Sequence, residues 1–218
     1  MKHHVVPRFR GSIAVRGAWL TGGLFIFAVS IICLYEARLG LSPWDALNQG
    51  ISKHTPLSFG TANIAVGCVI LVVAVLLGSQ IGIGTVANAV LVGTFVDLLL
   101  RIGWVTDLGH SSLTVRIGLL AVGIPLMGLA TGLYVGAGFG AGPRDSLMLA
   151  LVRHSGWRVG LVRGCLEASA TLAGFLLGGT VGIGTLLFVL AIGPAVEGSF
   201  VLLGRSSLSV GRVVESPA

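Results

Sequence analysis

Two aspartates stand in matching contexts 100 residues apart, and their side chains suit the binding of an ion or a proton. Asp45 ends the run 42–45 (SPWD), and Asp145 ends the run 142–145 (GPRD). A carboxylate inside a membrane is costly unless it is paired, hydrated or neutral, so such an acid is a candidate functional residue. The alternative is that each aspartate caps its own helix near the membrane surface by accepting backbone N–H groups. The sequence leaves both interpretations open.

Further polar residues extend this candidate site. Asn48 follows Asp45 by one helical turn, whereas Met148 occupies the equivalent place, so we expect the first run to supply more of the specific contacts. Glu197 aligns with Asp97 but has no basic partner on its helix face. Positive helix N-termini suit an anionic group, whereas the carboxylates favour a cation or a proton relay. The residues predicted to bind a solute or an ion are Ser42, Asp45, Asn48, Thr85, Asp145, Thr185 and Glu197.

Glycines and prolines surround these residues and predict the local backbone. A proline suits the first turn of a helix, and Ser42 with Asp45 fits a capping box. The motif Gly-Ile-Gly-Thr, at 82–85 and 182–185, predicts either a tight helical hairpin or a turn whose carbonyl and hydroxyl groups line a cavity. The residues predicted to shape the backbone are Gly40, Pro43, Gly82, Gly84, Gly140, Pro143, Gly182 and Gly184.

These motifs belong to a tandem repeat with an offset of 100 residues. Residues 40–47 align with 140–147, and the Gly-Ile-Gly-Thr motifs align with each other without a gap. We therefore predict two homologous repeats at 17–104 and 116–204. A linker at 105–115, a basic N-terminus at 1–16 and a polar tail at 205–218 complete the chain. Packed repeats place special environments at their interface, so we expect the site between the two copies.

Composition predicts that the bilayer is the solvent of this chain. Of its 218 residues, 54% are hydrophobic and only 10% are charged, and the mean hydropathy is +0.97. Six apolar runs have about the length of a transmembrane helix: 17–35, 59–77, 85–100, 117–135, 164–177 and 185–203. Two shorter segments, 44–52 and 144–152, are polar or brief. We therefore predict an all-α membrane bundle of six transmembrane helices and two short helices, which span either half or all of the bilayer.

The basic residues bear on topology rather than on nucleic-acid binding, because they lie between the apolar runs and form no single patch. If all eight segments cross and both termini are cytoplasmic, twelve of the fourteen Lys and Arg residues, Lys53 among them, lie on the cytoplasmic side, and only Arg38 and Arg144 lie at the other surface. This bias favours parallel repeats with eight crossings. If the short segments dip and return, the repeats are inverted with three crossings each. In the first half of the chain, the choice between these two topologies depends largely on Lys53.

Several classes of function are disfavoured by the residue types. Cys33, Cys68 and Cys165 lie in apolar segments without metal-ligand spacing, so neither a disulfide framework nor a metal site is predicted. The chain has no His-Glu-x-x-His or Gly-x-Ser-x-Gly motif, so we predict no catalytic residues, no enzyme activity and no cofactor.

The motif 42–45, the Gly-Ile-Gly-Thr repeats and the overall size resemble the YczE and YitT type of bacterial multi-pass membrane proteins, nearest the YczE branch. The resemblance covers nearly the whole chain. It implies a protein of the bacterial plasma membrane, and it carries over no binding or catalytic residues.

Three functions agree with these features. The first is a small secondary transporter or permease with its site between the repeats. The second is a non-transporting scaffold or accessory subunit, in which glycine-rich helix faces dock a partner and the acids serve as caps. The third is an intramembrane enzyme. The lipid bilayer and a small solute or ion are the expected partners, and a homo-oligomer through glycine-rich faces remains an alternative to a monomer.

Overall fold

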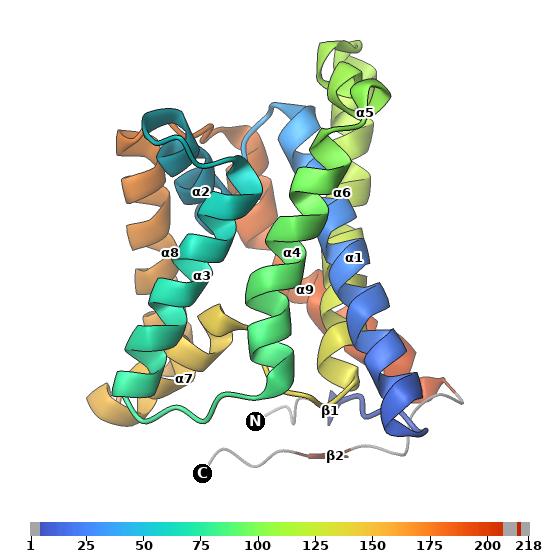
Figure 1. Ribbon diagram of the computed structural model, residues 1–218, viewed down its shortest axis with the longest axis vertical. Coiled ribbons are helices and arrows are strands. Elements are labelled where there is room, and N and C mark those ends of the chain that lie inside the picture. The colour runs from blue at the N-terminus through green and yellow to red at the C-terminus, as the bar shows by residue number, and fades with distance from the viewer. Residues whose placement is uncertain (1–4, 207–212, 215–218) are drawn as a thin grey trace.

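The computed structural model describes residues 5–206 and 213–214 and is an all-helical bundle (Figure 1). The predicted tail at 205–218 lies mostly outside the described residues. One antiparallel pair of two-residue strands, β1 (Val5–Val6) and β2 (Val213–Val214), joins segments near the two termini. The helices are α1 (Ile13–Ala37), α2 (Pro43–His54), α3 (Phe59–Leu76), α4 (Ile83–Leu100), α5 (Gly103–Asp107), the 3-10 helix η1 (Leu108–His110), α6 (Leu113–Gly136), α7 (Pro143–Ser155), α8 (Val159–Leu176) and α9 (Ile183–Arg205).

Six of the described helices are long and apolar enough to cross a membrane, and they coincide with the six predicted runs. They have 18 to 25 residues, enough to cross a hydrocarbon core about 30 Å thick. The prediction of an all-α membrane bundle with six long and two short helices is confirmed. We call α1–α4 the N-terminal half and α6–α9 the C-terminal half.

The long first helix of each half packs against its counterpart, and the two run in opposite directions. The Arg16 side chain, near the start of α1, donates a 2.8 Å hydrogen bond to the carbonyl of Ala137 just after α6. Arg116, near the start of α6, donates at the same distance to the carbonyl of Ala37 at the end of α1. The preferred arrangement of parallel repeats is therefore wrong, because parallel helices would place these ends on opposite sides of the membrane.

The short helices do not cross the bundle, so the expectation of eight crossings is also wrong. Leu41, just before α2, donates its backbone N–H to Thr180, and Lys53, in the last turn of α2, donates to Gly178. Both ends of α2 are thus held by the one turn that joins α8 to α9. A helix of 12 residues extends only about 18 Å, which is too short for the hydrocarbon core.

Each short helix packs mainly against a long helix of the other half. α2 lies against the end of α8, where Gly174 approaches the backbone of Ala46 and Leu47, and α7 lies against α3. Figure 1 shows α2 near one end of the bundle and α7 near the opposite end. The two halves therefore interlock, and the N-terminal turns of α2 and α7 approach each other inside the bundle.

Candidate functional site: a polar cavity between the halves

The start of α2 is built by its first residues. Pro43 occupies the first helical turn, and Ser42 is the N-cap, whose Oγ accepts the backbone N–H of Asp45 at 3.3 Å. The same hydroxyl donates to Oδ2 of Asp45 at 2.5 Å. Ser42 and Asp45 are both buried. The cap is thus the serine, and the aspartate carboxylate lies in the protein interior rather than at a hydrated surface.

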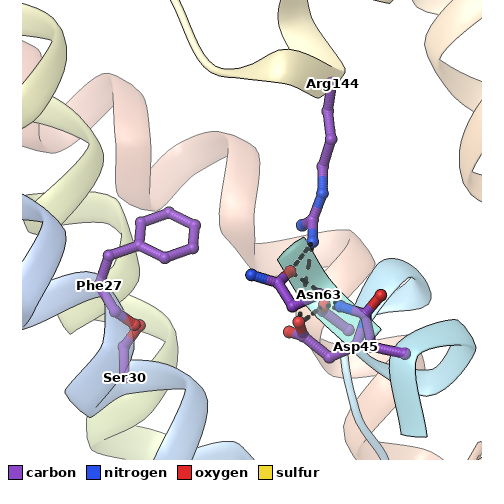
Figure 2. A network of polar contacts seen from close by, with 7 residues as sticks. Phe27, Ser30, Asp45, Asn63 and Arg144 are labelled. Carbon is purple, nitrogen blue, oxygen red and sulfur yellow. Dashed lines mark hydrogen bonds and ion pairs between the residues drawn. The ribbon is translucent and has the colours of Figure 1, made fainter. Parts of the chain in front are cut away.

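Arg144, in the first turn of α7, faces this carboxylate from the other half. Its Nη2 lies 3.8 Å from Oδ1 of Asp45, and Figure 2 shows the long side chain extending toward Asp45 and Asn63. The guanidinium also lies over the ring of Trp44, with 5.3 Å between Cζ and the ring centroid. This distance is within the range of a cation–π interaction. The N-termini of the two short helices are therefore bridged by one arginine.

Two asparagines continue the network. Asn48 donates from Nδ2 to Oδ1 of Asn63 at 2.9 Å, and Arg144 donates to the same oxygen at 3.4 Å. Among the described residues, Oδ1 of Asp45 and Oδ1 of Asn48 are buried and have no hydrogen-bond donor. Buried polar atoms without a partner are rare in proteins and are a mark of functional sites, so these two oxygens point to a binding function for this region.

A cavity of about 350 Å³ adjoins this network and is lined by helices from both halves. Its apolar wall includes Phe27, Val92, Met127 and Phe188. Its polar lining comprises Ser42, Asn63, Asn88, Thr131, Tyr134, Arg144, Asp145, Arg163 and Glu167. The Arg144 side chain keeps 30% of its surface accessible although the residue lies inside the bundle. A guanidinium with accessible surface in a mostly apolar cavity has donors left for a bound group.

Asp145, the residue after Arg144 in the first turn of α7, also lines the cavity. The hydroxyl of Tyr134 lies close to the start of α7, because a Cβ atom placed on Gly142 would be 3.2 Å from it. Arg163 forms an ion pair of 3.0 Å with Glu167 one turn along α8. The cavity thus contains arginines and carboxylates in close succession.

Four of the predicted binding residues, Ser42, Asp45, Asn48 and Asp145, are brought to the cavity or to the network beside it. Thr85 and Thr185 do not line it. Each accepts the backbone N–H three residues earlier, from Gly82 or Gly182, and so caps the start of α4 or α9. Glu197 is exposed on α9, away from the cavity lining.

The glycines predicted to shape the backbone do so through contacts between the halves. The N–H of Gly84 donates to Phe139 at 2.8 Å, and that of Gly184 donates to Leu39 at the same distance. Gly40 and Gly140 have φ values of +126° and +121°, which suit glycine, and both pack closely against the opposite Gly-Ile-Gly-Thr turn. The turns therefore join the two halves and leave the cavity to other residues.

Sequence reasoning missed Arg144, Trp44, Asn63 and Tyr134 as site residues. Arg144 was counted only as a charge on the membrane surface. Its signal was present in the sequence, because Arg144 stands where Trp44 stands at an offset of 100, just before the matching aspartate. In the part of the chain that the structure describes, no group of three His, Cys, Asp or Glu residues could hold a metal ion.

Comparison with known proteins identifies the family of this chain. A family model described as a family of unknown function, DUF6198, matches residues 14–199. The chain belongs to this family. The matched region runs from the first turn of α1 into the second half of α9, and the predicted resemblance to the YczE branch is confirmed.

Relatives cover nearly the full length of the chain. An uncharacterized protein of Haemophilus influenzae is 34% identical over 90% of this chain and 91% of its own length. The Bacillus subtilis uncharacterized membrane protein YczE is 34% identical over 83% of each chain. A second Bacillus subtilis protein, YyaS, is 28% identical over 87% of this chain and 94% of its own. No solved structure matches this DUF6198 protein.

Proposed function

We propose that this integral membrane protein is a small secondary transporter that binds a carboxylate-bearing solute in the cavity between its halves. The observation that carries the proposal is the position of Arg144. Its guanidinium is accessible inside the bundle. It lies at the N-terminus of the short helix α7 and faces the N-terminus of the short helix α2. Transporters with inverted repeats place their substrates at such helix starts, because the positive ends of the helix dipoles attract anionic groups.

The geometry of the Arg144 contacts supports an anionic ligand group. Nη2 is 3.8 Å from Asp45, which is longer than the 2.7–2.9 Å of a strong charge-assisted hydrogen bond. Arginine carries five N–H donors. Within the described residues, its only recorded hydrogen bond runs from Nη2 to Asn63. The remaining donors suit a planar carboxylate, while Asp145 and Glu167 could hold a cationic part of the same solute.

Paired contacts support the proposal that the two halves are inverted repeats. The bond from Arg16 to Ala137 corresponds, with an offset of 100, to the bond from Arg116 to Ala37. The bond from Gly84 to Phe139 corresponds in the same way to that from Gly184 to Leu39. Contacts that exchange the halves in this way are expected for a pseudo-twofold axis in the membrane plane.

Charge distribution supports a cytoplasmic location for the bundle end that carries the start of α1. The described basic residues at that end are Arg8, Arg10, Arg16, Arg153, Arg158, Arg163 and Arg205. Those at the opposite end are Arg38, Lys53, Arg101 and Arg116. Because cytoplasmic segments are enriched in Lys and Arg, this bias agrees with a bacterial plasma-membrane protein whose termini face the cytoplasm.

The first experiment tests whether the cavity is filled with water. Single cysteines are introduced as Asn88→Cys and Thr131→Cys in a variant without Cys33, Cys68 and Cys165 and are exposed to a membrane-impermeant thiol reagent. Val96→Cys is the matched control, because Val96 lies on α4 like Asn88 but is buried away from the cavity. We expect labelling at 88 and 131 and protection at 96. Protection at all three positions would favour the scaffold.

The second experiment tests the ligand class. The thermal stability of the purified protein in detergent is measured against a panel of small carboxylates and their neutral amides. We expect at least one carboxylate to raise the melting temperature, and Arg144→Gln to abolish the shift. Arg153→Gln is the control, because Arg153 lies at the end of α7 and contacts Ser79. Stabilisation by amides and carboxylates alike would contradict the role of Arg144.

A further inference from the structure

The two halves differ in how their last two helices meet. We call the contact between the start of α3 and the end of α4 the α3–α4 seam, formed by Ser58, Gly60, Gly93 and Asp97. We call the equivalent positions between α8 and α9 the α8–α9 seam, formed by Arg158, Gly160, Gly193 and Glu197. The first seam is closed in the structure, and the second is open.

The α3–α4 seam is closed by glycine packing and by a carboxylate. Gly60 and Gly93 approach so closely that a Cβ atom on either would overlap the backbone oxygen of the other. Asp97 accepts the backbone N–H of Gly60 at 2.8 Å and the hydroxyl of Ser58, the N-cap of α3. An acid at a helix N-terminus satisfies free amides and complements the helix dipole. Asp97 therefore locks α4 onto the start of α3.

The α8–α9 seam has the same parts without the same contacts. Across the described chain, no heavy atom outside the local backbone lies within 4 Å of a Cβ placed on Gly160 or Gly193. Glu197, in the place of Asp97, is exposed, and the N-cap Arg158 makes no side-chain cap hydrogen bond. The lining of the cavity continues between these helices, with Leu166 and Glu167 on α8 and Val196 and Phe200 on α9.

α9 also contains a proline that favours a kink, which α4 lacks. Pro194 lies inside α9, where Thr94 occupies the equivalent position in α4. A proline inside a helix removes one backbone hydrogen bond and favours a kink. The part of α9 beyond Pro194 carries Glu197, so bending there would move this carboxylate relative to the start of α8.

We infer that the two seams are alternating gates, and that Glu197 binds the N-terminus of α8 at Gly160 and Arg158 when the α8–α9 seam closes. The inference rests on the proposed transport function. The structure has the gate beside the termini open and the opposite gate closed. In the other state, Asp97 leaves Gly60 and the α3–α4 seam opens. Inverted repeats that exchange conformations in this way expose a central site to each side in turn.

Disulfide cross-linking of matched cysteine pairs tests the inference in membranes without any added solute. The first pair is Gly67→Cys with Ala89→Cys, because a Cβ on Gly67 would lie 3.3 Å from that of Ala89. The second pair, offset by 100, is Glu167→Cys with Val189→Cys, whose parent residues line an opening between α8 and α9. The native cysteines are replaced, and copper–phenanthroline is the oxidant.

We expect the 67/89 pair to cross-link readily and the 167/189 pair to cross-link in a smaller fraction. Asp97→Asn weakens the charge-assisted cap of α3, so it should raise the 167/189 fraction about fivefold and lower the 67/89 fraction. Glu197→Gln should lower the 167/189 fraction by a similar factor and leave the 67/89 pair intact. The conservative Glu197→Gln variant tests the inference even if Asp97→Asn fails to fold.

A 167/189 fraction that is the same in all backgrounds would overturn the inference, as would a fall in Asp97→Asn. A result of either kind would leave the ligand experiment on Arg144 unaffected, because the cross-linking contains no solute. Opposite responses to the two substitutions would instead establish paired gates even if the carboxylate panel shows no ligand.

Discussion

The two short helices, α2 and α7, begin with the same proline and aspartate but fix their first turns differently. In α2, Ser42 caps the helix and Asp45 is withdrawn from the cavity into the protein. In α7, the N-cap is Gly142, which provides no side-chain oxygen, while Arg144 and Asp145 both line the cavity. The first helix thus provides a fixed, buried acid, and the second provides the accessible charges.

This difference shows that the two halves share the backbone geometry that starts a short helix but differ in the side chains that this helix start presents. A proline in the first turn, preceded by glycine-rich sequence, occurs in both halves, and in each half a short helix starts inside the bundle. The cation of α7 is then held over the acid of α2. A tryptophan at 144, as at 44, would leave the Asp45 carboxylate without this counter-charge, so the difference between positions 44 and 144 makes the central pair possible.

The largest effect is expected when the pair between the helices is broken. Arg144→Ala leaves the buried Asp45 carboxylate without its counter-charge, so we expect a loss of about 3 kcal/mol in the free energy of unfolding. Denaturant unfolding in detergent measures it. The double variant Arg144→Ala, Asp45→Asn should recover about half of the loss. Equal losses in the single and double variants would contradict an interaction across the helix starts.

A smaller effect on stability is expected from two asparagines that line the cavity, and the two should differ in its size. Asn63→Ala removes the acceptor shared by Asn48 and Arg144 and should cost about 1.5 kcal/mol. Asn88→Ala is the matched control, because Asn88 also lines the cavity but makes no side-chain hydrogen bond recorded within the described residues. Its cost should stay below about 0.5 kcal/mol. The same unfolding assay compares them, and similar costs would show that the network is not the source of stability.

Substitutions at the N-caps of α2 and α7 should also differ in their cost to the free energy of unfolding, but by less than the two asparagine substitutions. Ser42→Ala removes the N-cap of α2 and should cost about 1 kcal/mol. Gly142→Ala removes no side-chain cap hydrogen bond. It should still cost about 0.5 kcal/mol, because glycine is a better N-cap than alanine and the new Cβ would lie 3.2 Å from the Tyr134 hydroxyl. Thermal unfolding of both variants measures the difference. A larger loss in Gly142→Ala than in Ser42→Ala would reverse the assignment of α2 as the fixed helix.

The smallest effect concerns the contact of α2 with the turn between α8 and α9. Gln49 accepts the backbone N–H of Thr180 at 2.6 Å, whereas the equivalent Leu149 is exposed. Gln49→Ala should cost about 0.5 kcal/mol, because water can replace part of the lost bond. Leu149→Ala should be neutral within error. Hydrogen exchange at Thr180 supplies an independent measurement, and unchanged protection in Gln49→Ala would count against the contact.

Local patterns predicted much of this fold because they act over a few residues. The six apolar runs, the Ser42 cap and the glycine turns depend on hydropathy and on neighbouring backbone groups. The predicted orientation of the second half depended on whether α2 crosses the membrane. The prediction of parallel repeats failed because α2 does not cross. Lys53 was assigned to the cytoplasmic side, whereas it reaches the turn at Gly178 on the opposite end. No local pattern records that long-range contact.

The site was predictable only in part for the same reason. Asp45 and Asn48 were found because they lie in one short polar segment. Arg144 joins them through the packing of α7 on α3, and Asn63 joins through α3 itself. Thr85 and Thr185 were predicted as possible ligands, but their hydroxyls are used within their own turns. A sequence shows which groups need partners, whereas the tertiary fold decides which partners they find.

The interlocking of the halves also bears on how the chain is made. α2 ends at His54, but the helix on which it packs begins only at Val159. During translation, the polar face of α2 must therefore wait in or beside the membrane until almost the whole protein has been synthesised. Insertion and final assembly are separate events for this chain, and a nascent N-terminal half is an incomplete structure that depends on late arrival of its counterpart.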